Sequence, residues 1–349
     1  MSSFDLVRVL LMSAMAFVIA IAWTPALTHV LYKYKLGKTI RDEKSAPIFY
    51  RLHLKKSGTP TMGGALVWGT VLALILFIHL LTAIFPDSTI AKFDFLSRAQ
   101  TLLPLGALVA SALVGLVDDY FNVKGIGPNG GGLRMRHRLL IYSLIAIVGA
   151  WWFYFKLDWH VMHVPFFGLF DIGAWYIPIF FFVIVATSFA VNQTDGLDGL
   201  AGGSLLMSFA SYAAIALMLG RPDLAVFCGA ISGALLAFLW FNIPPARFFM
   251  GDTGSMSLGV TLGIIAMLTN MALLLPVIGF VFVIVTVSSI IQLTSKKIRK
   301  KKVFLSSPIH HHLEAIGWSE SKIVMRFWVI SMISAALGVA LALLDSAAI

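Results

Sequence analysis

The stretch VLLMSAMAFVIAIAWTPALTHVLY, residues 9–32, contains no Lys, Arg, Asp or Glu. A helix that crosses the hydrocarbon core of a bilayer needs roughly 20 mostly apolar residues, and this stretch is long enough. Its apolar part is also longer than the core of a signal peptide. We therefore expect it to be retained as the first membrane span.

Runs of this kind recur along the whole chain, bounded by charged residues, Pro or Gly. Asn270 and Pro276 set the division between the eighth and ninth runs, because one uninterrupted helix there would be far too long, and the third run ends at a pair of aspartates. The expected fold is an all-α integral membrane protein of about ten transmembrane helices, with residues 1–349 as one polytopic membrane domain. The expected spans are Val9–Tyr32, Ala65–Phe85, Leu102–Val117, Leu139–Phe155, Ala174–Val191, Ala201–Leu219, Leu224–Phe241, Gly254–Leu275, Pro276–Thr294 and Ile323–Leu344.

The composition of the chain supports this class of fold. Hydrophobic residues make up 59% of the 349 residues and charged residues 12%, whereas soluble domains are about 45–50% apolar and about 25% charged. No soluble fold has an interior large enough to hide so much apolar surface. The net charge of +10 would suggest a nucleic-acid partner in a soluble protein. In a membrane protein it indicates loops facing anionic lipid, or an anionic substrate, and no nucleic acid.

Lys and Arg are distributed unevenly between the loops. The loops after odd-numbered spans hold 20 of them and the loops after even-numbered spans hold 4. Because cytoplasmic loops carry the excess of positive charge, the odd loops are expected to be cytoplasmic and both termini periplasmic. An error of one span would erase this bias, so its clarity supports the count.

Polar residues gather in the loops assigned to the cytoplasm. The first loop ends in KSGTPTMGG, residues 56–64, where Lys56 could meet a phosphate as a point charge. The second begins at Asp118 and Asp119, which directly abut an apolar run, where two like charges cannot both ionise freely. Such a pair suits a general base or a Mg²⁺ ligand, whereas carboxylates at a helix C-terminus would oppose the helix dipole.

The third cytoplasmic loop, NQTDGLDG, places Asn192, Asp195 and Asp198 beside two glycines, with no basic residue among them. Glycines let a ligand approach the backbone closely, and the polar side chains could bind the edges of a sugar or a base. An Asx turn with helix caps would explain one of these aspartates but not the whole set.

The fourth cytoplasmic loop, NIPPARFFMGDTGS, runs from Asn242 to Ser255. Its Asp252 could cap the following helix or bind a metal ion, and both roles suit a carboxylate at that place. Phe249 could stack on a base or serve as an ordinary interfacial aromatic residue.

The fifth cytoplasmic loop contains PIHHHLE, residues 308–314. Three consecutive histidines cannot all face one ion on regular structure, which disfavours a zinc site, but imidazoles can donate to a diphosphate. The Gly-rich stretch at residues 125–132 lacks the Lys and Ser/Thr of a P-loop and is expected to be a hairpin between spans. His29 and His79 fall inside expected spans, where neighbouring helices should satisfy them.

Taken together, these loops place five carboxylates and several cations on one membrane face, without a thiolate, since Cys228 is the only cysteine. Oxygen ligands with adjacent cations are typical of Mg²⁺ and phosphate chemistry. The residues alone therefore predict a Mg²⁺-assisted transfer between a cytosolic diphosphate and a lipid substrate.

Five blocks of the sequence resemble the signatures of one family of enzymes. They are GTPTMGG at Gly58–Gly64, DDY at Asp118–Tyr120, NQTDGLDGLAGG at Asn192–Gly203, FMGDTGS at Phe249–Ser255 and PIHHHLE at Pro308–Glu314. Together they are similar to the phospho-N-acetylmuramoyl-pentapeptide transferases, the MraY family. This family belongs to the polyprenyl-phosphate N-acetylhexosamine-1-phosphate transferase superfamily. The aspartate blocks are shared across that superfamily, while TPTMGG and PIHHHLE point to the muramoyl-pentapeptide branch.

The resemblance implies a specific reaction. UDP-MurNAc-pentapeptide and undecaprenyl phosphate give undecaprenyl-diphospho-MurNAc-pentapeptide, called lipid I, and UMP. This is the first membrane step of peptidoglycan synthesis, which serves cell shape and division, in the bacterial cytoplasmic (inner) membrane. The resemblance further implies Mg²⁺ as cofactor and a homodimer.

The resemblance also assigns roles to residues. Asp252 would bind the Mg²⁺, Asp118 would deprotonate the lipid phosphate, and Asp119 would support the metal or the lipid phosphate. The imidazoles of the fifth loop would face the diphosphate or the sugar, and Phe249 would lie near the uracil. The expected substrate-binding residues are Lys56, Lys124, Arg138, Asn192, Asp195, Asp198, Asn242, Phe249, His310, His311 and His312.

The second cytoplasmic loop departs from the family pattern. The family usually carries a Lys three residues after the second Asp of DDY, where this chain has Asn122, and Lys124 is expected to take its role. A second family lysine corresponds to Arg138, which keeps the charge but changes the donor geometry.

Two mechanisms and two other functions remain open from the sequence. The lipid phosphate could attack directly with Asp118 as base, or a carboxylate could form a covalent phospho-sugar intermediate. A sibling enzyme would transfer GlcNAc-1-phosphate, which the His block disfavours. An ion-coupled transporter would place acids near span centres and show an internal repeat, and neither feature is visible here.

Overall fold

The protein is described by a computed structural model that covers residues 2–37, 50, 52–127 and 131–348. Within these residues ten helices are long and apolar enough to cross a membrane, which confirms the expected number and makes the chain a multi-pass membrane protein. The spanning helices are α1 (Ser3–Lys33), α3 (Ala65–Ile84), α4 (Leu102–Val123), α5 (Met135–Trp151), α6 (Tyr176–Thr194), α7 (Leu200–Met218), α8 (Pro222–Asn242), α9 (Gly251–Leu268), α11 (Phe280–Ile298) and α13 (Glu320–Ala348). The shorter helices are α10 (Leu275–Ile278) and α12 (Ile309–Ala315).

Helix α9 forms the centre of the bundle. Every residue of α9 except Asp252 is buried, and α9 packs against α4 on one side and α6 on another. The outer helices expose large apolar side chains such as Phe77 and Phe182, which is the surface expected of helices that face lipid. Asp252 is in the first turn of this central helix. The active site is therefore expected at that end of the bundle.

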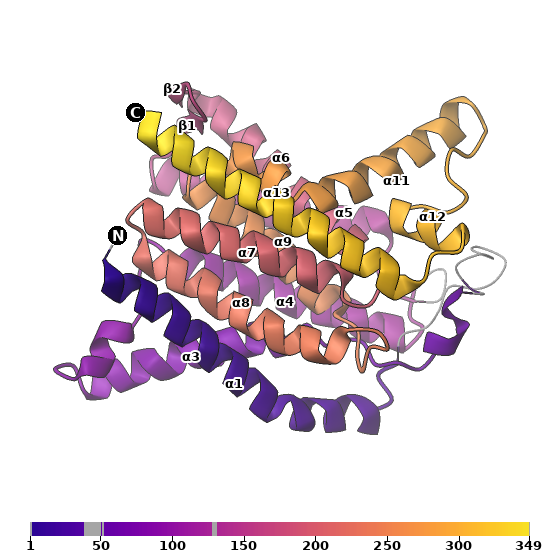
Figure 1. Ribbon diagram of the computed structural model, residues 1–349, viewed down its shortest axis with the longest axis horizontal. Coiled ribbons are helices and arrows are strands. Elements are labelled where there is room, and N and C mark those ends of the chain that lie inside the picture. Colours follow the sequence, from indigo (N-terminus) through magenta and orange to yellow (C-terminus); the bar gives the residue numbers. More distant parts are fainter. Residues whose placement is uncertain (1, 38–49, 51, 128–130, 349) are drawn as a thin grey trace.

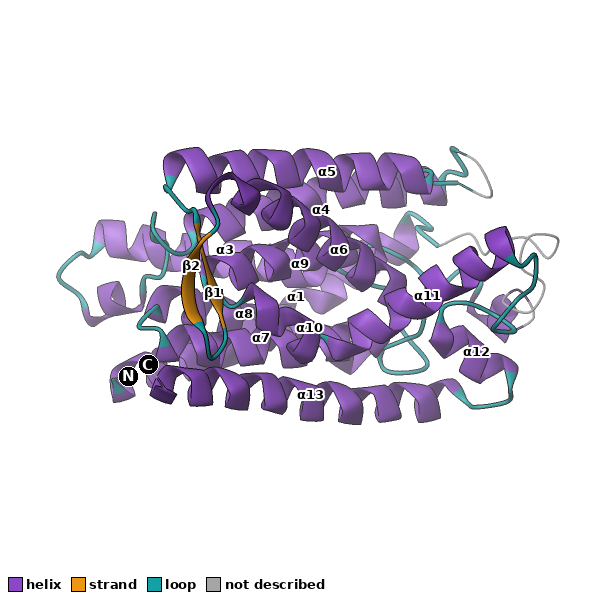
Figure 2. Cartoon of the chain, turned by 90° about the horizontal axis from the view of Figure 1, so that it is seen from above, coloured by secondary structure: helices purple, strands orange, loops and turns teal. Residues whose placement is uncertain are grey.

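Both chain termini lie at one end of the bundle, and α12 lies at the other (Figure 1 and Figure 2). The two termini lie at the same end because the number of spans is even. The turn that leads into α9 lies at the α12 end, together with the C-terminal ends of α4, α6 and α8. The loops expected to carry the polar residues are therefore at the end opposite the termini.

The expected third span was too short. Helix α4 continues past Val117, through Asp118 and Asp119, and ends at Val123. The helix can continue because both carboxylates are buried against donors from other segments. The ninth span begins at Phe280 rather than Pro276, since Pro276 lies in the separate helix α10.

The expectation of an all-α fold needs one correction. Strands β1 (Val161–Val164) and β2 (Gly168–Asp171) form an antiparallel hairpin at the end that holds the termini (Figure 2). Asp345 of α13 fixes the hairpin, because its carboxylate accepts the backbone N–H of Phe166 at 2.6 Å. This contact joins segments 179 residues apart, so no local pattern predicts it.

Candidate active site

Arg138 joins two of the predicted catalytic carboxylates. Its Nε lies 2.8 Å from Oδ2 of Asp118, and one terminal nitrogen lies 2.7 Å from Oδ2 of Asp252. The other terminal nitrogen is 3.4 Å from Oδ1 of Asn192. Asp118 is fully buried, and its second oxygen accepts the backbone N–H of Leu133. These four side chains come from α4, α5, α6 and α9, and we call them the carboxylate cluster.

Asp119 has a different environment from Asp118. Its carboxylate accepts the backbone N–H groups of Asp252 and Thr253, at 3.1 and 3.0 Å, and the hydroxyl of Thr61 at 3.2 Å. These amides are the first donors of α9, which no carbonyl within that helix can satisfy. A negative charge there is also stabilised by the helix dipole. Asp119 therefore holds the start of α9 against α4 and positions Asp252.

The backbone at Gly251 makes this contact possible. Gly251 has φ +73, and a Cβ there would lie 2.5 Å from Oδ2 of Asp119. Both the conformation and the close approach exclude a side chain at this position. The glycine before Asp252 therefore allows the carboxylate of Asp119 to reach the end of the helix.

The amide of Asn192 orients Asp252 from the opposite side. Its Nδ2 donates to Oδ1 of Asp252 at 2.6 Å and to Oγ of Ser255 at 2.9 Å. Tyr142 lies one turn after Arg138 on α5 and is fully buried, and its hydroxyl makes no hydrogen bond within the described chain. The structure thus brings Asp118, Arg138, Asn192 and Asp252 together, and their roles in catalysis and binding stay predictions.

A second group of charges surrounds Lys56. Its Nζ lies 2.7 Å from Oδ1 of Asp198 and 2.5 Å from Oε1 of Glu320, and 6.0 Å from the centroid of the Phe249 ring. Glu320, in the first turn of α13, also accepts the backbone N–H of Asp198 at 2.8 Å. We call Lys56, Asp198 and Glu320 the lysine cluster. Its ammonium group is held by two carboxylates beside an aromatic face.

Asn242 connects the loops that carry these residues. Its side-chain oxygen accepts the N–H of Gly199, and its amide donates to the carbonyl of Phe248, both at 2.8 Å. Phe249 donates its N–H to the carbonyl of Pro60 at 2.8 Å, which ties this loop to the TPTMGG segment. Asn242 is 4% exposed, and its side chain forms hydrogen bonds with backbone groups in this structure. Its predicted contact with substrate stays a prediction.

The three histidines of α12 face three different environments, as expected for consecutive residues. His310 is fully buried, and neither of its ring nitrogens is hydrogen-bonded to a described residue. His312 Nδ1 accepts the N–H of Leu305 at 3.3 Å. His311 Nδ1 lies 2.7 Å from the carboxylate of Glu314. Burial lowers the pKa of His310 well below its usual value, and His311 and His53 lower it further. His310 is therefore neutral at physiological pH.

Glu314 is shared between two imidazoles. Besides contacting His311 it lies 3.5 Å from Nε2 of His53. In the described part of the chain these three residues form the only group of His, Cys, Asp or Glu whose potential ligand atoms all lie within 4.8 Å of one another. Burial raises the pKa of Glu314, while the nearby His53 and Lys56 lower it. Because the Glu314 carboxylate lies 2.7 Å from Nδ1 of His311, it fixes the orientation of that ring.

Two more predicted residues lie at the C-terminal ends of helices. Lys124 is exposed at the end of α4, with its ammonium 5.8 Å from the Tyr120 ring centroid. Asp195 caps the C-terminus of α6 and is partly exposed. Their proposed roles with substrate stay predictions.

Sequence reasoning missed Glu320, Tyr142 and Glu314. Tyr142 had a signal, since it stands four residues after Arg138 and so shares a helical face with it. Glu314 had one too, because it follows His311 by one helical turn. No local sequence pattern pointed to Glu320, because its partner Lys56 lies 264 residues away in the chain.

The chain is similar to known proteins over most of its length. The sequence profile of glycosyl transferase family 4 matches residues 101–270. The phospho-N-acetylmuramoyl-pentapeptide-transferase of Chloroflexus aggregans is 37% identical over 97% of this chain and 91% of its own length. The proteins of the same name from Geobacillus thermodenitrificans and Bacillus subtilis are 40% and 38% identical, each over 93% of this chain and 95% of their own length.

Proposed function

The chain belongs to the phospho-N-acetylmuramoyl-pentapeptide transferase family, and from this premise we propose how its site performs the transfer. It is an enzyme that moves phospho-MurNAc-pentapeptide from UDP-MurNAc-pentapeptide to undecaprenyl phosphate, giving lipid I and UMP. The observation that carries the proposal is the carboxylate cluster, since the buried Asp118 and the partly exposed Asp252, held by one cation at one end of a membrane bundle, suit phosphate chemistry.

The carboxylate cluster fits a Mg²⁺ ion. Its acceptors are the carboxylate oxygens of Asp118 and Asp252 and the amide oxygen of Asn192, and oxygen donors are what Mg²⁺ prefers. These oxygens already pair with one cation, the guanidinium of Arg138. We propose Asp252 as the main ligand, because it is the one residue of α9 that is not buried. When bound, Mg²⁺ would neutralise the diphosphate and orient UMP as leaving group.

The residues of the chain would act as follows. An oxygen of the lipid phosphate attacks the phosphorus that carries the sugar, and the bond from that phosphorus to the UMP oxygen breaks. Asp118 takes the proton of the lipid phosphate, which requires Arg138 to release Oδ2 of Asp118. The freed guanidinium can then bind the diphosphate through its fork of N–H donors.

The lysine cluster is proposed to bind the nucleotide sugar. Lys56 would meet a phosphate, and the ring of Phe249 beside it would stack on the uracil. Asp198 and Glu320 hold the ammonium in place before the substrate arrives. His311, oriented by Glu314, would donate to the diphosphate or the sugar.

We propose that this end of the bundle faces the cytoplasm, since the loops there carry most of the Lys and Arg. The termini would then be periplasmic and the membrane would be the bacterial inner membrane. A homodimer, which the family implies, is also proposed. Light scattering of the detergent-purified protein would measure its mass.

The function is tested by UMP release from detergent-purified protein with undecaprenyl phosphate. UDP-MurNAc-pentapeptide and UDP-GlcNAc are offered side by side, each with Mg²⁺ and with EDTA. Release from the first substrate alone, abolished by EDTA, is expected. UMP release from UDP-GlcNAc would assign the chain to the sibling GlcNAc-1-phosphate transferases. No UMP release from either substrate by folded protein would favour the ion-coupled transporter instead. Omitting the lipid tests the mechanism, because UMP released with a sugar phosphate bound to the protein would contradict direct attack.

A further inference from the structure

The buried face of α5 carries one polar side chain, that of Tyr142. The other buried residues of this helix are Ala146, Gly149 and Ala150, which are small and apolar. Tyr142 is 0% exposed, and its hydroxyl has no hydrogen-bond partner within the described residues. A buried donor that stays unsatisfied costs free energy. The hydroxyl of Tyr142 therefore needs a partner that the described chain does not supply.

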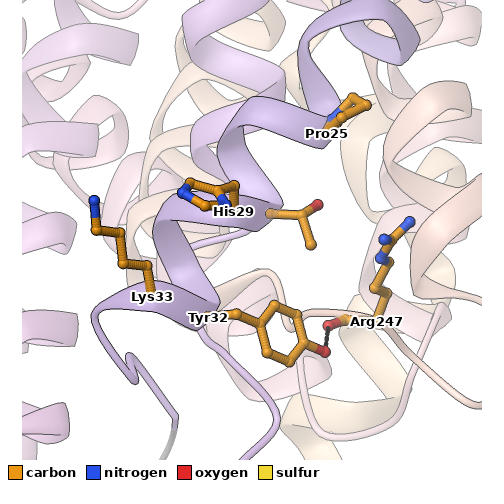
Figure 3. Close-up of a pocket in the computed structure, with 6 residues that line it drawn as sticks. Pro25, His29, Tyr32, Lys33 and Arg247 are labelled. Atoms are coloured by element: carbon orange, nitrogen blue, oxygen red, sulfur yellow. Dashed lines mark hydrogen bonds between the residues drawn. The ribbon is translucent and has the colours of Figure 1, made fainter.

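Two other tyrosines show how such a hydroxyl is satisfied elsewhere in the bundle. Tyr212, which is also fully buried, donates to the carbonyl of Met271 at 3.2 Å. Even the exposed Tyr32 at the end of α1 donates to the carbonyl of Arg247 at 3.0 Å, as Figure 3 shows. Among the described tyrosines, only Tyr142 and Tyr176 have a buried hydroxyl without a hydrogen bond.

The hydroxyl of Tyr142 lies beside the carboxylate cluster. Tyr142 follows Arg138 by four residues and therefore lies on the same side of α5. The charges of Asp252, Arg138 and Asp118 all act on its hydroxyl. Oδ1 of Asp252 accepts a hydrogen bond from Asn192 at 2.6 Å, and its Oδ2 accepts one from Arg138 at 2.7 Å. Both oxygens of Asp252 are thus already engaged by other donors.

The ion pair beside Tyr142 also leaves hydrogen-bonding capacity open. Nε of Arg138 and Oδ2 of Asp118 lie 2.8 Å apart and are both buried, but neither atom makes a hydrogen bond within the described residues. The cluster therefore holds two buried donors, Nε and the hydroxyl, and one buried acceptor. A phosphate group that carries a proton matches this set, because its oxygens accept hydrogen bonds and its P–OH group donates one to a carboxylate.

We propose that the hydroxyl of Tyr142 donates a hydrogen bond to a phosphate oxygen of the bound substrate. This inference rests on the proposed function and adds a substrate-binding residue to its site. Negative charge is spread over the phosphoryl oxygens in the transition state, and a donor already fixed in a buried place stabilises that charge. The phosphate of the lipid and the diphosphate of the nucleotide sugar both offer such acceptor oxygens.

The test compares Tyr142→Phe with the wild type in UMP release and in thermal unfolding of the full-length, detergent-purified protein. The matched control is Tyr176→Phe, which removes an equally buried hydroxyl without a hydrogen bond, at the other end of α6 from Asn192. A hydrogen bond to a charged group contributes about tenfold to a hundredfold in affinity, so kcat/KM of Tyr142→Phe should fall by that factor. Tyr176→Phe should keep the wild-type kcat/KM. Without substrate, neither variant should melt below the wild type, because each loses only an unsatisfied hydroxyl.

The KM for each substrate, measured at saturating concentration of the other, identifies the phosphate. A rise in KM for undecaprenyl phosphate would assign the hydroxyl to the lipid phosphate, and a rise for UDP-MurNAc-pentapeptide would assign it to the diphosphate. A loss confined to kcat would show that the hydrogen bond forms in the transition state.

Three results would overturn the proposal while the wild type still releases UMP. They are wild-type kinetics in Tyr142→Phe, an equal loss of kcat/KM in Tyr176→Phe, and a lower melting temperature of Tyr142→Phe without substrate. The last result would show that the hydroxyl has a partner within the protein.

A wild type that releases no UMP from UDP-MurNAc-pentapeptide would instead contradict the proposed function. The role of Tyr142 is then decided by thermal stabilisation with undecaprenyl phosphate and with UDP-MurNAc-pentapeptide. A smaller stabilisation of Tyr142→Phe than of the wild type would support the inference. Equal stabilisation of the two proteins, or none in the wild type, would overturn it.

Discussion

Gly115 of α4 lies directly against the backbone of Asp252 at the start of α9. A Cβ at Gly115 would come within 2.4 Å of the Asp252 carbonyl oxygen, so α4 and α9 can approach this closely only because position 115 has no side chain. Asp118 and Asp119 follow one turn later on the same helix. The distance between the two helices therefore sets the distance between the predicted base and the predicted metal ligand.

Replacing Gly115 by Ala should separate these helices. Overpacking of this kind costs about 1–3 kcal/mol of stability, and a displacement of about 1 Å at a reacting group can cost about a hundredfold in rate. We expect a lower melting temperature and a loss of transfer activity of that order. The matched control is Gly106→Ala on the same helix, where a Cβ would meet nothing within 4 Å. Equal activity in the two variants would contradict this role for Gly115.

Arg138 is expected to act in place of a metal when none is bound. Arg138→Gln removes the cation from two carboxylates, and an uncompensated buried charge typically costs about 3–5 kcal/mol. The variant should melt at a lower temperature without Mg²⁺ and gain more from added Mg²⁺ than the wild type does. Arg136→Gln, at an exposed position of the same helix, is the control. An identical response to Mg²⁺ in wild type and Arg138→Gln would show that the two cations do not share the cluster.

Lys56 is expected to contribute to binding of the nucleotide sugar. Lys56→Gln removes a charged contact to phosphate, which is worth about 1.5–3 kcal/mol, so KM for UDP-MurNAc-pentapeptide should rise about tenfold or more. Glu320→Gln is the matched comparison. It keeps an oxygen that can accept the Asp198 N–H, and Asp198 still holds Lys56, so KM should change less than threefold. A larger effect of Glu320→Gln than of Lys56→Gln would contradict the proposed role of Lys56.

His310 should make the protein sensitive to acid. Because burial lowers its folded-state pKa below the usual 6.5, the folded state binds fewer protons than the unfolded chain does. The stability contribution is complete above pH 6.5 and is lost as the pH falls below it, by up to about 1.4 kcal/mol per pH unit. Melting temperatures between pH 7.5 and 5.5 should fall less in His310→Gln than in the wild type. His160→Gln, a partly exposed histidine, should behave as the wild type, and parallel curves for all three would exclude His310 as the cause.

The spans and the polar loops could be predicted because their signals are local. Twenty or so apolar residues in a row and an excess of Lys and Arg on alternate loops are readable without any tertiary contact. The same holds for Asp118, Asn192 and Asp252, since each is a polar residue at the end of an apolar run. The structure brings these three side chains to one place, and their roles in the reaction stay predictions.

The division of labour within the site could not be predicted in this way. Asp119 and Asn242 are polar residues of the kind that bind substrates. Their side chains instead form hydrogen bonds with backbone groups of α9 and of the loops beside it. Local sequence also gives no indication that Glu320 meets Lys56, or that Asp345 ties down a hairpin. Contacts of this kind depend on which helices pack together, and that packing is set by the whole bundle.

The most direct test of the account is the dependence of UMP release on Mg²⁺ in Asp252→Asn. The substitution keeps the size of the side chain and its place at the start of α9 but removes the charge proposed to bind the ion. The control is Asp87→Asn, at an exposed position beyond the far end of α3. We predict that Asp252→Asn folds, loses at least about a hundredfold of the rate and gains little at any Mg²⁺ concentration, while Asp87→Asn follows the wild type. A folded Asp252→Asn protein with the Mg²⁺ dependence and rate of the wild type would contradict the assignment of the carboxylate cluster as the active site.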